Sequence, residues 1–78
     1  MNEEPTLPPR QLECLRRIAA GQTTQEIALE LGLSRHTVDH YVASACAKLH
    51  ARSRAHAVAI AIARNLLDPA AGADTGEI

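Results

Sequence analysis

Apolar side chains recur along this chain about every three to four residues, which is the spacing of amphipathic α-helices. The third such stretch carries one continuous apolar stripe, formed by Val38, Tyr41, Val42, Ala45 and Leu49. Polar and small side chains occupy the opposite face of the same stretch. The pattern predicts four helices, over residues 9–20, 24–31, 35–49 and 54–67.

Capping and turn residues separate these helices. Thr23 and Glu26 have the spacing of a capping box, which predicts the start of the second helix. Gly32 ends that helix, Leu33 fills the turn from inside, and Ser34 caps the third helix. Two short helices joined by a glycine-containing turn form a helix-turn-helix, whose second helix can enter the major groove of DNA. The other boundaries are marked by Pro8-Pro9, Gly21, Ser53 and Asp68-Pro69.

Composition supports an all-α fold, because Ala is abundant and strand-forming residues are sparse. The 78 residues allow one domain with a small core, and that core must be aliphatic because the chain has one Tyr and no Trp or Phe. The fourth helix carries a second apolar stripe that such a small domain cannot cover. This stripe predicts a dimer interface or, alternatively, a modest exposed apolar patch. Its members are His56, Ile60, Ala63 and Leu67.

The net charge of −1 conceals a basic body with acidic ends. Residues 7–67 contain all eight Lys and Arg side chains and four of the nine acidic ones, which gives that segment a charge of +4. We expect residues 1–6 to form a flexible acidic leader and residues 68–78 to form a disordered acidic tail. A basic body suits a polyanionic partner, although an ordinary solvated surface would have the same charge.

The sequence offers little for catalysis, cofactors or metals. Cys14 and Cys46 both fall on apolar helix faces, so we interpret them as core residues in a reducing cytoplasm. His36 and His40 have an i, i+4 spacing, but they lack the HExxH order and no cysteine shares their face. No nucleophile–base pair, phosphate-binding glycine loop, signal peptide or membrane span is evident. We therefore expect a cytoplasmic protein that is not an enzyme and binds no metal, no cofactor and no membrane.

A long set of correctly spaced motifs resembles one known family. The motifs include Leu7-Pro8-Pro9-Arg10, Glu26-Ile27-Ala28, Thr37-Val38, Lys48-Leu49 and Ser53-Arg54. Together they make residues 7–67 similar to the LuxR-type, or GerE-like, helix-turn-helix domain of bacterial transcription regulators. The resemblance is nearest to quorum-sensing and stand-alone members. It implies a four-helix DNA-binding domain in which the third helix recognises DNA and the fourth mediates dimerisation.

The chain has no room for the signal-binding or receiver domain that usually precedes this module in the family. We therefore expect either a stand-alone member or a domain cut from a longer protein.

The resemblance and the helix-turn-helix pattern nominate the residues that would contact DNA. The start of the second helix can hold a phosphate or simply cap the helix. The start of the third helix meets base edges, and cations at its other end grip phosphates. Asp39 can accept a hydrogen bond from cytosine, and Ala43 can touch a thymine methyl group. The predicted contacts are Thr23, Thr24, Gln25, Arg35, His36, Thr37, Asp39, His40, Ala43, Lys48, Arg52 and Arg54.

Three positions depart from the family pattern. Pro8 replaces the usual Thr or Ser cap of the first helix, and the other two lie on the outward face of the third helix. Asp39 stands where the family usually has Lys, Arg or Asn, and Ala43 stands where many members have a further cation. The outward face of the third helix is therefore either adapted to an unusual DNA sequence or a weak DNA face.

Two functions fit these observations. The first is a homodimeric transcription regulator that binds double-stranded DNA. The alternative is an antiactivator, a small module whose fourth helix forms a heterodimer with a full-length LuxR-type regulator and blocks its DNA binding.

Overall fold

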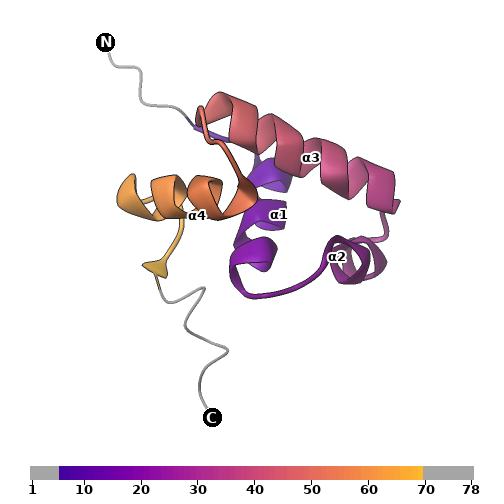
Figure 1. Ribbon diagram of the computed structural model, residues 1–78. Coiled ribbons are helices and arrows are strands. Elements are labelled where there is room, and N and C mark those ends of the chain that lie inside the picture. Colours follow the sequence, from indigo (N-terminus) through magenta and orange to yellow (C-terminus); the bar gives the residue numbers. More distant parts are fainter. Residues whose placement is uncertain (1–5, 70–78) are drawn as a thin grey trace.

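The computed structural model describes residues 6–69, which form four α-helices. They are α1 (Pro9–Ala19), α2 (Thr24–Leu31), α3 (Arg35–Lys48) and α4 (Arg54–Ala63), and Figure 1 shows their arrangement. The described residues contain no strand, so the all-α fold predicted from the pattern is confirmed. The expected leader and tail fall mainly on residues 1–5 and 70–78, which lie outside the described residues.

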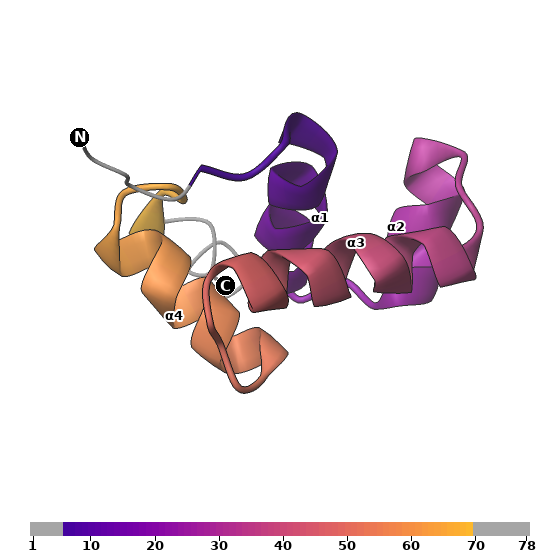
Figure 2. The same cartoon turned by 90° about the horizontal axis from the view of Figure 1, so that it is seen from above.

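Two helices organise the domain, because α1 and α3 each contact all three of the others. Seen from above, α3 lies across α1, with α2 near one end of α3 and α4 near the other (Figure 2). The helix-turn-helix formed by α2 and α3 is therefore held from behind by α1. This arrangement leaves the side of α3 opposite α1 open for contact.

The core consists of two groups of buried side chains on either side of α1. Cys14 of α1, Ile27 and Ala28 of α2, and Val38 and Val42 of α3 form the group that joins the helix-turn-helix to the body. A second group joins α1, the end of α3 and α4, and it consists of Leu7, Leu15, Ala45, Leu49, Ala57, Ala61 and Leu67. Each fully buried Leu, Ile or Val contributes about 1.5–3 kcal/mol to the folded state.

The helix starts follow the predicted caps. The side chains of Thr23, Ser34 and Ser53 each accept a backbone N–H from the third residue of α2, α3 and α4 respectively. At α1 the capping position is Pro8, whose side chain forms no such bond. Three of the four helices are therefore fixed at their start by a hydroxyl, which contributes about 1 kcal/mol each.

Each of the four helices is followed by a residue in the left-handed conformation. In such a C-terminal cap, N–H groups of residues just beyond the helix donate to carbonyls of its last turn. At α3, His50 donates to Ala47 and Ala51 donates to Cys46, at 3.1 and 2.9 Å. The residues with positive φ are Gly21, Gly32, His50 and Asn65.

The prediction that the fourth helix runs to residue 67 is wrong, because α4 ends at Ala63. Asn65 has a φ of 62°, and the next residue, Leu66, donates its N–H to Ala61 O at 2.7 Å. Asn tolerates the left-handed conformation because its short polar side chain can hydrogen-bond locally. The chain then turns back, and Leu67 is only 4% exposed in the core. The predicted ends of the first and third helices, at residues 20 and 49, are each one residue too long.

Candidate nucleic-acid interface

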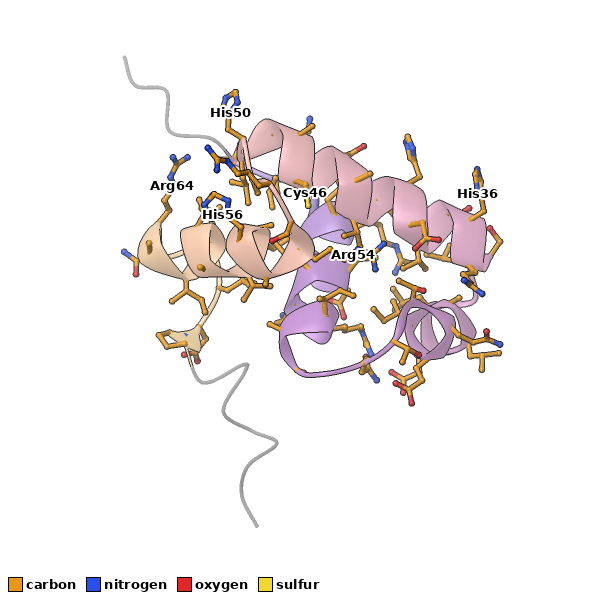
Figure 3. All side chains as sticks on the ribbon, in the orientation of Figure 1. His36, Cys46, His50, Arg54, His56 and Arg64 are labelled. Carbon is orange, nitrogen blue, oxygen red and sulfur yellow. The ribbon has the colours of Figure 1, made fainter. Side chains whose placement is uncertain are left out.

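The outward face of α3 is polar and accessible, as its pattern predicted. Val38, Val42 and Ala45 are buried against the body. Thr37 and Asp39 are half-buried at the edge of the outward face. Figure 3 shows His36 pointing away from the body at the start of the helix. The exposed members of this face are Arg35, His36, His40, Ala43, Ala47 and Lys48.

The start of α3 is rigidly capped. Ser34 Oγ accepts the backbone N–H of Thr37 at 3.0 Å, and the hydroxyls of the two residues lie 2.9 Å apart. The Thr37 hydroxyl is thus engaged within the protein, and it helps to fix the turn that carries Arg35 and His36. The first N–H groups of a helix lack partners within the helix, and they favour negative charge nearby.

The start of α2 forms the complete capping box. Thr23 Oγ1 accepts the N–H of Glu26 at 3.1 Å, and Glu26 Oε1 accepts the N–H of Thr23 at 2.9 Å. Thr23 therefore has the capping role, which was one of its two predicted roles. The Glu26 carboxylate also places a negative charge in this turn. Thr24, which is half-buried, and Gln25, which is exposed, remain the candidates for a phosphate contact there.

Asp39 is paired with a cation from another helix. Arg54, the first residue of α4, donates from Nη2 to Asp39 Oδ1 at 3.1 Å. The two side chains are 46% and 42% exposed, so the pair lies at the surface between α3 and α4. This pairing was not predicted, because a contact across 15 positions leaves no local signal in the sequence.

The acidic groups of α1 and α2 are also engaged. Glu13 bonds to both Arg16 and Arg17, and Arg17 in turn bonds to Glu30 of α2. Hydrogen bonds from Arg16 and Arg17 lower the pKa of Glu13, because they favour its charged carboxylate. The network ties α2 to α1 and keeps the helix-turn-helix in register with the body.

Most of the cations that have no acidic partner among the described residues lie around α3, and the other two are Arg10 of α1 and Arg64 after α4. Every acidic side chain between residues 7 and 67 has a partner: Glu13, Glu26, Glu30 and Asp39. By contrast, Arg35, Lys48 and Arg52 form no salt bridge with another described residue. These three cations flank the two ends of α3. They place positive charge at both ends of its outward face, although the whole chain has a net charge of −1.

The turn from α3 to α4 uses a histidine as a hydrogen-bond acceptor. His56 Nδ1 accepts the backbone N–H of Arg52 at 3.0 Å, and the His56 N–H donates to Ser53 Oγ at 3.0 Å. Figure 3 shows His50, His56 and Arg64 on the same side of this region.

The candidate dimer stripe is shorter than predicted. His56 and Ala63 are exposed on α4, and Ile60 is half-buried against the core. Leu67 was expected on this stripe, but it lies beyond the end of α4 and packs inside the domain. Ala59 is also exposed on α4, between His56 and Ala63, and it was not predicted as part of the stripe. Its spacing of three residues from His56 would have placed it on the same helix face.

The cysteines and histidines form no candidate metal site. Within residues 6–69 no three His, Cys, Asp or Glu side chains are grouped to hold an ion. Cys14 and Cys46 are free thiols, and burial raises the pKa of the Cys14 thiol. None of the described helices is long and apolar enough to cross a membrane.

The sequence matches a protein-family model described as bacterial regulatory proteins, luxR family, over residues 5–61. An uncharacterised transcriptional regulatory protein of Bacillus subtilis, YvfU, is 44% identical over 61 residues, covering 78% of this chain and 30% of that protein. A quorum sensing-dependent transcriptional regulator of Brucella abortus, VjbR, is 42% identical over 62 residues, covering 80% of this chain and 24% of its own length.

A probable transcriptional regulatory protein of Mycobacterium tuberculosis, NarL, is 44% identical over 64 residues, covering 82% of this chain and 30% of that protein. The chain thus spans less than a third of the length of these relatives.

Proposed function

Because the chain belongs to the luxR family of bacterial regulatory proteins, we propose that it binds double-stranded DNA as a homodimer and thereby regulates transcription. In this proposal α3 enters the major groove and α4 forms the dimer interface. Such an activity requires the protein to be in the bacterial cytoplasm, where the DNA lies. The link to quorum sensing expected from the sequence belongs to VjbR by its name, and for this chain it stays a prediction.

One observation supports DNA binding above the others. The cations that flank α3 have no acidic partner among the described residues, while each acidic side chain of residues 7–67 is already engaged. Binding to DNA is driven largely by cations that neutralise phosphates and release counterions. A helix whose ends carry available cations, and whose outward face is exposed, has the charge and the shape for a major groove.

The contacts divide into two groups by their position. Arg35, His36 and His40 lie on the outward face of the first turns of α3, and we assign them to base edges. Ala43, one turn further, suits a thymine methyl group. Cations at the far end of α3, together with the start of α2, contact phosphates. This phosphate group consists of Thr24, Gln25, Lys48 and Arg52.

The homodimer rests on the outward face of α4. Small side chains at Ala59 and Ala63 allow two helices to approach closely, and Ile60 adds apolar area at the edge. A domain of this size buries a limited core, so a second copy would add stability. Pairing through α4 would also fix the distance between the two α3 helices, and hence the spacing of the two DNA half-sites.

Fluorescence polarisation tests DNA binding. The chain is titrated into a randomised duplex pool and into DNA from upstream of its own gene, across a series of salt concentrations. Submicromolar binding that weakens steeply with salt, together with enrichment of a two-fold symmetric site, is the expected result. A folded chain that shows no salt-dependent binding would contradict the proposal. It would favour the antiactivator alternative, in which α4 pairs with a full-length LuxR-type regulator.

Sedimentation velocity tests the homodimer. Ala59→Glu places a negative charge in the centre of the proposed interface, so it should shift the chain to monomer. Ala47→Glu is the matched control, because Ala47 is also an exposed helical alanine but lies on α3. Equal sedimentation of both variants and the unchanged chain would remove α4 from the interface.

A further inference from the structure

We propose that Asp39 is a positioning residue for Arg54, and that the guanidinium it holds is a specificity-determining contact with DNA. This inference rests on the DNA-binding function proposed above and assigns a new role to the residue that departs most from the family pattern. Asp39 then contacts no base itself. It determines the direction in which the Arg54 guanidinium can donate hydrogen bonds.

Both ends of the pair are fixed by the fold. Asp39 lies on the second turn of α3, and Val38 beside it is fully buried. Arg54 is the first residue of α4, directly after Ser53, whose hydroxyl caps the helix through His56 N–H at 3.0 Å. Figure 3 shows Arg54 leaving the start of α4 toward α3. The Asp39–Arg54 bond of 3.1 Å thus selects one direction for a long side chain whose backbone is already held.

The chemistry of the pair fits a DNA contact better than a stabilising bridge. An arginine fork has five N–H donors, and the bond to Asp39 uses one of them. The others can reach a phosphate oxygen or the edge of a guanine. A side chain that is already held loses less entropy on binding than a free one. Both groups are nearly half exposed, and exposed ion pairs contribute little to folding.

The pairing also changes how Asp39 would act near DNA. An isolated carboxylate on the outward face would repel phosphates, whereas a carboxylate bonded to Arg54 presents a nearly neutral pair. One of its oxygens is already occupied by Arg54, which reduces its capacity to accept from a cytosine amino group.

A double-mutant cycle tests the proposal. Asp39→Ala, Arg54→Ala and the double variant are compared for binding to the site enriched by the unchanged chain and to random duplex. Each single substitution should lower the ratio of specific to nonspecific affinity about tenfold, the scale of one good base contact. The double variant should lower the ratio no further than the worse single variant. Independent, multiplying effects would overturn the proposal.

Asp39→Asn separates position from charge. The asparagine oxygen can still accept from Arg54, so this variant should keep most of the specificity that Asp39→Ala loses. A direct cytosine contact predicts a different result. In that case Asp39→Ala would abolish preference at one base pair whether or not Arg54 is present, and the positioning role would be wrong.

Arg52 supplies the matched control. It is an exposed cation two residues before Arg54, and it forms no salt bridge with the other described residues. Arg52→Ala should weaken binding to every duplex alike, reduce the salt slope by about one unit, and combine independently with Asp39→Ala. Coupling of Asp39 to Arg52 as strong as to Arg54 would indicate a general charge effect and overturn the proposal.

The outcomes separate this inference from the function beneath it. If the unchanged chain binds no duplex, both proposals fail. If it binds with specificity but the Asp39 and Arg54 effects are independent, only the positioning role fails. Thermal unfolding of each variant shows that the fold is retained, because the exposed pair should change the unfolding temperature little.

Discussion

Individual side chains in this domain determine which charges stay available for a partner and where the backbone turns. The acidic groups are drawn to arginines or to a helix start, which leaves cations available around α3. At the turn after α3 the backbone of His50 is held in the left-handed region, with a φ of 57°. A side chain with a Cβ atom is disfavoured in that conformation, so the turn is fixed by its hydrogen bonds at a local cost.

His50→Gly should stabilise the folded domain. Glycine adopts positive φ without a Cβ clash, and this gain exceeds the entropy that glycine loses on folding, for a net effect of about 1 kcal/mol. Urea denaturation measures the change. Ala43→Gly is the opposite control, because in the middle of α3 the same residue should cost about 1 kcal/mol. A loss of stability in His50→Gly would show that the His50 side chain itself holds the turn.

Glu13→Gln should reveal an acid-dependent contribution to stability. The pKa of Glu13 is lowered in the folded domain by its hydrogen bonds to Arg16 and Arg17. Its contribution is therefore complete above the ordinary pKa of 4.5 and is lost as the pH falls through the lower folded value. The unchanged chain should be more stable than the variant at pH 7, by less than about 1 kcal/mol.

The difference between the two chains should shrink as the pH falls below 4.5, and it should vanish once Glu13 is protonated in the folded domain as well. Thermal unfolding across this range measures it. A difference that stays constant from neutral to acidic pH would show that the carboxylate charge has no part in it.

The helices of the domain differ in how far their own sequence defines them. The starts of α2, α3 and α4 are local events, since the capping hydroxyl and the N–H it accepts are three residues apart. Such signals, and the apolar stripe of α3, could be predicted from the sequence. The end of α4 could not, because Asn65 stops a helix less strongly than glycine does, and the apolar pattern continues through Leu67.

The predicted site residues divide in the same way. The outward position of His36 and His40 followed from helical periodicity, and that of Arg35 from its place at the start of the helix. The bond between Asp39 and Arg54 could not be foreseen, because it depends on the angle at which α4 meets α3. Packing between helices determines that angle, and a single sequence carries no local trace of it.

Ser34→Ala should destabilise the domain by about 1 kcal/mol, since it removes the acceptor for the Thr37 N–H. The same substitution should weaken binding to DNA, because the cap positions the turn that carries Arg35 and His36. Ser44→Ala is the control within the same helix, where alanine is the better helix former and no loss is expected. Equal stability of both variants would mean that the Ser34 cap contributes nothing.

At the scale of the molecule, stability depends on two small groups of buried side chains that share α1. The group formed with α4 includes Leu67, which belongs to no helix and folds back after the Asn65 turn. With so small a core, each large buried side chain accounts for a considerable part of the net stability.

Leu67→Ala should therefore destabilise the domain by about 2–5 kcal/mol, the range for removing a buried leucine side chain. Leu29→Ala provides the contrast, because Leu29 is 76% exposed on α2 and its removal should change stability by no more than about 0.5 kcal/mol. Chemical denaturation of both variants gives the two values. Similar values would mean that Leu67 does not belong to the core in solution.

The position of Leu67 also bears on where this folding unit stops. The segment shared with the family ends at residue 61, yet the core includes a leucine six positions later. Leu7 lies in the same buried group, so residues near both limits of the described segment belong to one cluster. A variant trimmed to the segment shared with the family would lack the buried side chain of Leu67. Burial of side chains, and not the extent of similarity to relatives, therefore sets the limit of the folding unit.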